Sequence, residues 1–228
     1  MPGPAEPLGP APRGTAAPDR VWYAAYGSNM HADRIRCYLA GGIPAGSAHR
    51  YPGCREPRDP ERSVPVWLPG TLYFATESLV WTGGRAFYDP DGDGTVAARA
   101  HLVTAGQFAD LVAQEMYRPP GTDLDLAAVL GAGRYAIGPG RYETLVCAGT
   151  LTGLPVLTCT APAGYRELPG NPPSAAYLRH LGAGLAEAHG WPPERAARYL
   201  AAAPGAHGHW TAAAVEAVLR GHDPAPPG

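Results

Sequence analysis

The stretch YAAYGSNM, residues 23–30, joins two segments with different sequence patterns. The residues that lead into it are apolar and predict a buried strand over Val21–Tyr26. The strand then stops at Gly27, where a residue without a Cβ atom can adopt positive φ and turn the chain sharply. An ordinary surface turn explains this stop, and so does a loop that holds a charged group.

The two polar residues after the glycine, Ser28 and Asn29, are typical of a helix start, and a short helix is predicted over His31–Leu39. The first N–H groups of a helix have no partner within the helix, so they can bind a carboxylate. A capped turn without a ligand remains an adequate explanation of these residues by themselves. The rest of the chain has to decide between the two interpretations.

Composition excludes several kinds of protein. The 18 basic and 20 acidic residues nearly balance and form no long run, which argues against a surface for nucleic acid or anionic membrane. All of the basic residues are arginine, and with 30 Gly and 27 Pro this is typical of GC-rich coding, so arginine alone carries little functional information. No apolar run has the length of a signal peptide or a membrane span. We therefore expect a cytoplasmic protein.

The four cysteines show no metal-binding spacing and are expected to be free thiols. No nucleotide fingerprint is present either, so no metal or other cofactor is predicted. The sequence leaves formation of a homodimer open.

Residues 1–19 are rich in Pro, Gly and Ala and are predicted to be a disordered tail, followed by a single domain over 20–228. Residues 43–69 are predicted to be a loop, and 117–140 an irregular insertion with a short helix near Leu124–Leu130. The other predicted strands are Thr71–Thr76, Val96–Val103, Tyr142–Ala148 and Val156–Thr160; the C-terminal helices are Ala175–His189, Glu194–Ala202 and Thr211–Arg220. This order of elements predicts an α+β fold with a helical C-terminal end.

The segment DPDGDG, residues 89–94, resembles the first half of a calcium loop. Its twelfth position is Ala100, where a bidentate Glu is required, so a plain hairpin turn is favoured.

A helix is predicted from Thr104, which forms a capping-box pattern with Gln107. Its apolar stripe contains Phe108 and Leu111, and Glu115 lies on the same stripe, seven and four residues later. The opposite, polar face carries Gln107, Asp110 and Gln114. A carboxylate that faces a core has a raised pKa, which suits proton transfer. The alternative is that Glu115 turns back to water or pairs with Arg118 at the helix end.

Four segments together resemble the γ-glutamylcyclotransferase family: YAAYGSNMHADRI, WTGGRAFYDPDGDG, DLVAQEM and NPPSAAYLRHLGAG, over roughly residues 21–205. The resemblance implies a small, mostly antiparallel β-barrel surrounded by helices. It also implies that Glu115 is the catalytic acid and base. The γ-glutamyl group would be bound by Tyr26, Gly27, Ser28 and Asn29, with Tyr142 lining the pocket.

The activity that the resemblance implies is cleavage of a γ-glutamyl amide by attack of its own α-amine, which releases 5-oxoproline and a free amine without any cofactor. The residues after Glu115, Met116–Pro119, depart from the glycine that is common in the family, so the substrate can differ. A related transferase or hydrolase with the same pocket is the second hypothesis. The third is a non-catalytic module that binds a small molecule.

Overall fold

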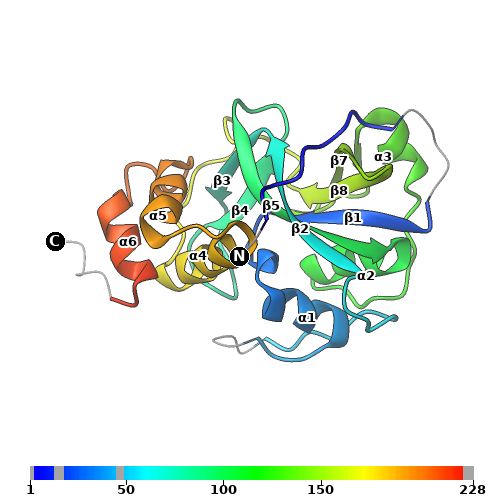
Figure 1. The fold of residues 1–228 in the computed structure, drawn as a ribbon, viewed down its shortest axis with the longest axis horizontal. Coiled ribbons are helices and arrows are strands. Elements are labelled where there is room, and N and C mark those ends of the chain that lie inside the picture. The colour runs from blue at the N-terminus through cyan, green and yellow to red at the C-terminus, as the bar shows by residue number, and fades with distance from the viewer. Residues whose placement is uncertain (1–2, 13–17, 45–48, 223–228) are drawn as a thin grey trace.

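The computed structural model describes residues 3–12, 18–44 and 49–222 and has an α+β architecture (Figure 1). The strands are β1 (Arg20–Ala25), β2 (Arg62–Pro69), β3 (Thr71–Ala75), β4 (Arg85–Asp89), β5 (Thr95–Thr104), β6 (Arg134–Ala136), β7 (Thr144–Leu151) and β8 (Leu154–Thr160). The helices are η1 (Ser28–Met30, a 3₁₀ turn), α1 (Ala32–Ala40), α2 (Ala105–Glu115), α3 (Ala127–Ala132), α4 (Ala175–His189), α5 (Pro193–Ala202) and α6 (Ala212–Leu219).

Six strands form one mixed sheet in the order β2-β5-β1-β8-β7-β6, and β3 pairs with β4 in a second, two-stranded sheet. Every strand pair is antiparallel except β1 with β8. The expected α+β class and the predominance of antiparallel pairs therefore fit. The expected barrel is not confirmed, because the edge strands β2 and β6 do not pair with each other in the described part of the chain.

Strand β1 lies in the middle of the large sheet because both of its faces are apolar. Its five residues from Val21 to Ala25 are all buried, as expected for a strand that is covered on both sides. Pairing with β5 sets Tyr23 opposite His101, and pairing with β8 sets it beside Leu157. This central strand thus delivers residues 26–30 to the interior of the molecule.

Three strands, β2, β4 and β6, lie where the sequence predicts no strand. Over β2 the buried residues Val64, Val66 and Leu68 alternate with more exposed ones, which is the pattern of a half-buried strand. Its prolines hid this pattern: β2 is an edge strand, where a missing N–H group is tolerated. Residues 85–89 form β4, between the predicted strands that end at Thr76 and begin at Val96, and residues 134–136 form β6, within the predicted irregular insertion.

The DPDGDG segment is a turn but not a hairpin turn, because it joins β4 and β5, which pair with other strands. A single turn can therefore carry the chain from the small sheet to the large one.

The predicted C-terminal helices are confirmed, and they gather at one end of the molecule (Figure 1). Ser174 caps α4 by accepting a hydrogen bond from the Tyr177 N–H group, and Gly190 ends the helix in the left-handed conformation. Pro193 opens α5 at a position where its missing N–H group costs nothing. These helix ends depend on local sequence, which is why their bounds were predictable.

The N-terminal segment differs from its expectation where the structure describes it. The N–H group of Glu6 donates to the Pro65 carbonyl at 2.9 Å, and Gly9 exchanges hydrogen bonds with Thr150. Leu8 packs against the core. Backbone pairing to a sheet needs few apolar side chains, so residues 3–12 can be ordered despite their composition; residues 1–2 and 13–17 lie outside the described residues.

Candidate active site

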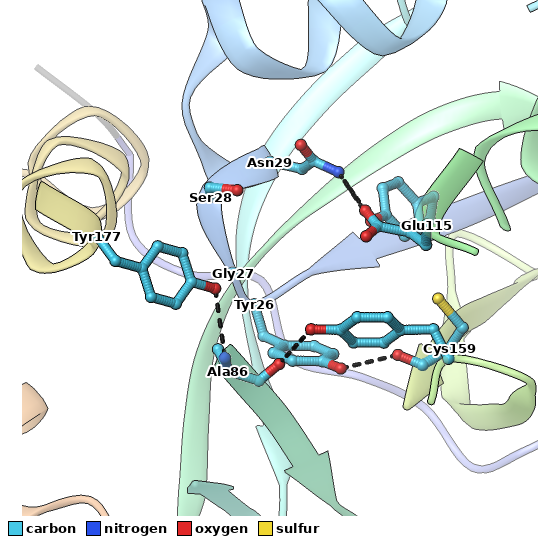
Figure 2. A pocket seen from close by; sticks show the side chains of 10 residues that line it. Tyr26, Gly27, Ser28, Asn29, Ala86, Glu115, Cys159 and Tyr177 are labelled. Atoms are coloured by element: carbon cyan, nitrogen blue, oxygen red, sulfur yellow. Dashed lines mark hydrogen bonds between the residues drawn. The ribbon is translucent and has the colours of Figure 1, made fainter. Parts of the chain in front are cut away.

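The loop at residues 26–29 lies at the end of β1 and lines a pocket. This pocket is bounded by side chains and backbone from β1, η1, α2, β4, β8 and α4 (Figure 2): Tyr23, Tyr26, Gly27, Ser28, Asn29, Ala86, Glu115, Tyr142, Cys159 and Tyr177. All six residues singled out in the sequence, Tyr26, Gly27, Ser28, Asn29, Glu115 and Tyr142, therefore meet in one place.

Gly27 does not adopt the positive φ expected from the sequence; its φ is −104°. The turn is made instead by η1, in which the Met30 N–H group donates to the Gly27 carbonyl at 3.1 Å. A Cβ atom at Gly27 would lie 3.4 Å from the Tyr177 hydroxyl. A side chain at this position would therefore contact the Tyr177 hydroxyl, which lines the same pocket.

The backbone at Ser28 and Asn29 offers donors to a ligand. Among the described residues, none accepts a hydrogen bond from either N–H group. Amides at the first turn of a helix carry partial positive charge, and 3₁₀ turns share this property. The loop is therefore suited to an anionic group such as a carboxylate.

Asn29 is buried, and its backbone carbonyl is held in place by His101. The ring Nε2 of His101 donates to the Asn29 carbonyl at 3.0 Å, while its Nδ1 lies 2.8 Å from the Ser63 hydroxyl. Burial and the nearby Arg99 lower the pKa of His101 to about 4, so the ring is neutral at physiological pH. His101 thus positions the loop and does not add charge to it.

The capping box predicted for α2 is confirmed: Thr104 accepts from the Gln107 N–H group, and the Gln107 side chain accepts from the Thr104 N–H group. The helix runs eleven residues from this cap and ends at Glu115. Phe108 and Leu111 are buried on the stripe that Glu115 shares. The cap therefore fixes where along the helix, and on which face, the carboxylate stands.

Glu115 is half-buried, and it borders the pocket. Its Oε1 accepts a hydrogen bond from Asn29 Nδ2 at 3.0 Å (Figure 2). It does not pair with Arg118, which forms an ion pair with Glu143. The alternative of an end-of-helix acid that pairs with Arg118 is therefore wrong.

Burial raises the pKa of Glu115, although the nearby Arg34, Tyr38 and Arg141 and the hydrogen bond from Asn29 partly lower it. Desolvation disfavours the charged form of a carboxyl group more strongly than these neighbours favour it. A carboxyl group with a raised pKa is a stronger base than an ordinary carboxylate, and its acid form can return the proton to a leaving group.

Three tyrosines form the other walls of the pocket. The Tyr26 hydroxyl donates to the Cys159 carbonyl at 2.8 Å, and the Tyr142 hydroxyl donates to the Ala86 carbonyl at 2.8 Å. The Tyr177 hydroxyl instead accepts from the Ala86 N–H group at 3.4 Å (Figure 2). Within the described residues the proton of Tyr177 has no acceptor, so this hydroxyl can donate to a ligand.

Cys159 contributes a thiol to the pocket, but this thiol is not suited to act as a nucleophile. Burial and the neighbouring Glu115 raise the pKa of its thiol well above the usual value. A reactive cysteine needs the reverse, a lowered pKa from a cation or a helix N-terminus. The thiol is therefore protonated at neutral pH and packs as a small apolar group.

A second cavity adjoins the pocket and shares Ser28, Glu115, Tyr142 and Tyr177 with it. Its further lining includes aromatic rings and three arginines, Arg34, Arg85 and Arg141. Sequence reasoning missed all three. A signal was present only for Arg34, which lies on the apolar face of α1 next to Ile35 and one turn before Tyr38.

Sequence reasoning also misjudged the second face of α2. Gln107, Asp110 and Gln114 are all buried, although they were assigned to a polar face. Residues 54–58 cover them and bond to them: Arg55 donates to Asp110, and the Gln107 side chain donates to the carbonyls of Glu56 and Arg58. Tyr177 was missed as a site residue, although it is the tyrosine of the NPPSAAY segment.

The described residues contain no group of three or more His, Cys, Asp and Glu side chains that could hold a metal ion. In that same part of the chain no helix is both long and apolar enough to span a bilayer.

Comparison with known proteins gives few and partial matches. No protein-family model matches the chain. Histone deacetylase 5 of Arabidopsis thaliana is 33% identical over an alignment of 215 residues, and this alignment covers 86% of this chain and 32% of that protein. The chain therefore spans about a third of the length of this curated relative.

Among solved structures, an uncharacterized protein from Homo sapiens superposes with a TM-score of 0.48 at 18% identity, covering 89% of this chain and 99% of that one. A γ-glutamyl cyclotransferase superposes with a TM-score of 0.49, also at 18% identity and with the same coverage. At this level of similarity neither name transfers to this chain.

Proposed function

We propose that this chain is an enzyme of the γ-glutamylcyclotransferase type, which cleaves a γ-glutamyl amide and releases 5-oxoproline. The observation that carries the proposal is Glu115: a carboxylate with a raised pKa, bordering a pocket whose facing loop offers the free amides of Ser28 and Asn29. The motif resemblance of the sequence agrees with it.

Binding of the substrate head group would use the two sides of the loop. The amides of Ser28 and Asn29 would hold the α-carboxylate. The Asn29 Oδ1 atom is buried without a partner among the described residues, and it would accept from the α-ammonium group next to Glu115. This arrangement brings the amine toward the γ-carbonyl, so that ring closure needs little further loss of freedom.

The chemistry would proceed through two proton transfers on Glu115. The carboxylate removes a proton from the α-ammonium, and the free amine attacks the γ-carbonyl carbon to form the lactam C–N bond. Glu115 donates this first proton to the leaving nitrogen as the old C–N bond breaks, and the regenerated carboxylate then removes the second proton from the lactam nitrogen. The products are 5-oxoproline and the free amine, which takes up the second proton from Glu115 as an ammonium. The Tyr177 hydroxyl would donate to the oxyanion that forms on the way.

The test is incubation of the purified chain with γ-glutamyl amino acids and γ-glutamyl amines, with products identified by mass spectrometry. We expect 5-oxoproline from these substrates and no product from glutaryl amides, which lack the attacking amine. Release of glutamate or glutarate would identify a hydrolase instead. Binding of the amides without any turnover would favour the non-catalytic module.

A further inference from the structure

The second cavity contains an excess of positive charge that the chemistry of Glu115 does not use. Arg34, Arg85 and Arg141 line it together with one carboxylate, that of Glu115. None of the three arginines forms an ion pair with a carboxylate of the described residues. Three guanidinium groups against one carboxylate leave two positive charges uncompensated.

Arg34 is the most deeply buried of the three, with 4% of its surface exposed. Its Nη2 donates to the Tyr51 hydroxyl at 2.8 Å and its Nε donates to Ser28 Oγ at 3.3 Å, but its Nη1 has no partner in the described structure. The guanidinium lies over the rings of Tyr51 and Trp81, at 4.9 and 5.2 Å from their centroids. A buried cation without an anion is costly, so this arrangement is one that an anionic ligand would complete.

The other two arginines also keep donors available. Arg141 donates to the Glu115 carbonyl at 3.2 Å and lies over the Tyr117 ring, yet its buried Nε has no partner among the described residues. Arg85 is buried and donates to the Glu77 carbonyl. Guanidinium groups suit phosphate and carboxylate oxygens because their N–H groups lie in a planar fork.

The γ-glutamyl head group carries one positive and one negative charge, so it does not compensate this excess. Building on the proposed function, we propose that the second cavity is the leaving-group subsite and binds a group with two negative charges. The preferred substrates would then be γ-glutamyl amides whose leaving amine carries a dianion, either a phosphate monoester or a pair of carboxylates. Glu115 and Ser28 border both cavities, which places the scissile bond between the head group and this dianion.

The experiment compares matched substrates that differ only in the second half of the molecule. One pair is the γ-glutamyl derivatives of O-phosphoethanolamine and ethanolamine; the other is γ-glutamylaspartate and γ-glutamylasparagine. We expect kcat/KM for 5-oxoproline release to be roughly tenfold or more higher for the more negative member, because charge-assisted hydrogen bonds are the strong ones. A preference in one pair alone identifies the dianion; equal rates in both pairs overturn the proposal.

Arginine variants assign the preference to the cavity. Arg34→Gln and Arg141→Gln should each bring the ratio within a pair toward one, and the ratio is the readout because Arg34 also contacts the substrate loop. Arg141 is only half-buried, so its variant keeps the test valid if Arg34→Gln does not fold. Arg198→Gln, an exposed arginine on α5 outside both cavities, should leave the ratio unchanged.

A failure of the proposed function is distinguishable from a failure of this subsite. If no γ-glutamyl amide yields 5-oxoproline, calorimetric binding of O-phosphoethanolamine and of aspartate to the chain decides. If either compound binds and Arg141→Gln weakens that binding, the anion site is supported, although the proposed cyclotransferase activity is rejected. Turnover of neutral amides without any preference for the dianion leaves the activity in place and removes the subsite.

Discussion

Two carboxylates of α2, Asp110 in the middle of the helix and Glu115 at its C-terminal end, lie in opposite environments. Asp110, five residues before Glu115, is 1% exposed and accepts from the Arg55 N–H group, the Arg55 guanidinium and the Gly121 N–H group. Glu115 accepts from Asn29, and no cation of the described residues lies within ion-pair distance. The first carboxylate is saturated with donors and is therefore structural, whereas the second is kept basic and open to a pocket.

The sharpest test of this difference is Glu115→Gln. The amide keeps the shape and can still bond to Asn29, but it cannot carry a proton between the two nitrogens. We expect the rate of 5-oxoproline release to fall by about 10³-fold, within the range for loss of a general acid–base group. The fold should persist, as measured by circular dichroism. Full activity in this variant would contradict the assignment of Glu115 as the acid and base.

The opposite result is expected for Asp110→Asn, which removes a structural charge. Loss of the carboxylate leaves the Arg55 guanidinium and two backbone N–H groups without a full acceptor, so we expect the free energy of unfolding to fall by about 2 kcal/mol. The loss should not be larger, because water can still solvate the partly exposed Arg55. Urea unfolding measures this change.

The matched control is Asp123→Asn, which removes the exposed second partner of the same Arg55. Exposed ion pairs contribute little, so its cost should stay below about 1 kcal/mol. Equal losses in Asp110→Asn and Asp123→Asn would show that burial does not separate the two carboxylates.

The sequence predicted the helix face of Glu115 but not the burial of Asp110. The capping box and the spacing from Phe108 placed Glu115 correctly, because helix register follows from local residues. The same reasoning put Asp110 on a polar face. Its burial depends on residues 54–58, which come from a loop about 50 positions earlier and carry no periodic pattern.

The arginine cavity was beyond sequence reasoning for the same physical reason. Arg34, Arg85 and Arg141 come from α1, β4 and the loop before β7, so only the tertiary fold brings them together. A composition in which every basic residue is arginine gave no reason to single them out. The open mixed sheet likewise depends on the long-range pairing of β2 with β5 and of β8 with β1, which alternation of apolar residues does not specify.

The pocket contains a hydroxyl whose proton has no acceptor among the described residues, that of Tyr177. If it donates to the oxyanion, Tyr177→Phe should lower kcat by about tenfold or more with little change in KM. Tyr199→Phe is the matched control, because the hydroxyl of the half-buried Tyr199 also accepts one backbone N–H bond, from Ala97, but lies outside the pocket. Both variants should lose similar stability, and only Tyr177→Phe should lose rate. Equal rates in the two variants would remove Tyr177 from the oxyanion site.

The smallest expected effect concerns the stability cost of keeping Glu115 basic. A carboxyl group whose pKa is raised in the folded state binds its proton more tightly there than in the unfolded chain. Its contribution to stability is therefore full below its ordinary pKa and is lost as the pH rises through the folded value. Glu115→Gln has no such loss, so the free energy of unfolding of the variant should increase relative to that of the wild type as the pH rises. Asp110→Asn, in contrast, should lower the free energy of unfolding. Because Arg34, Arg141 and Asn29 offset part of the desolvation, the gain should be smaller than that loss. Thermal unfolding of the wild type and Glu115→Gln between pH 4 and 8 measures the Tm of the variant minus that of the wild type, and this difference should rise with pH. A difference that falls toward pH 8 would mean that the Glu115 carboxylate is stabilised by folding, as a structural acid is.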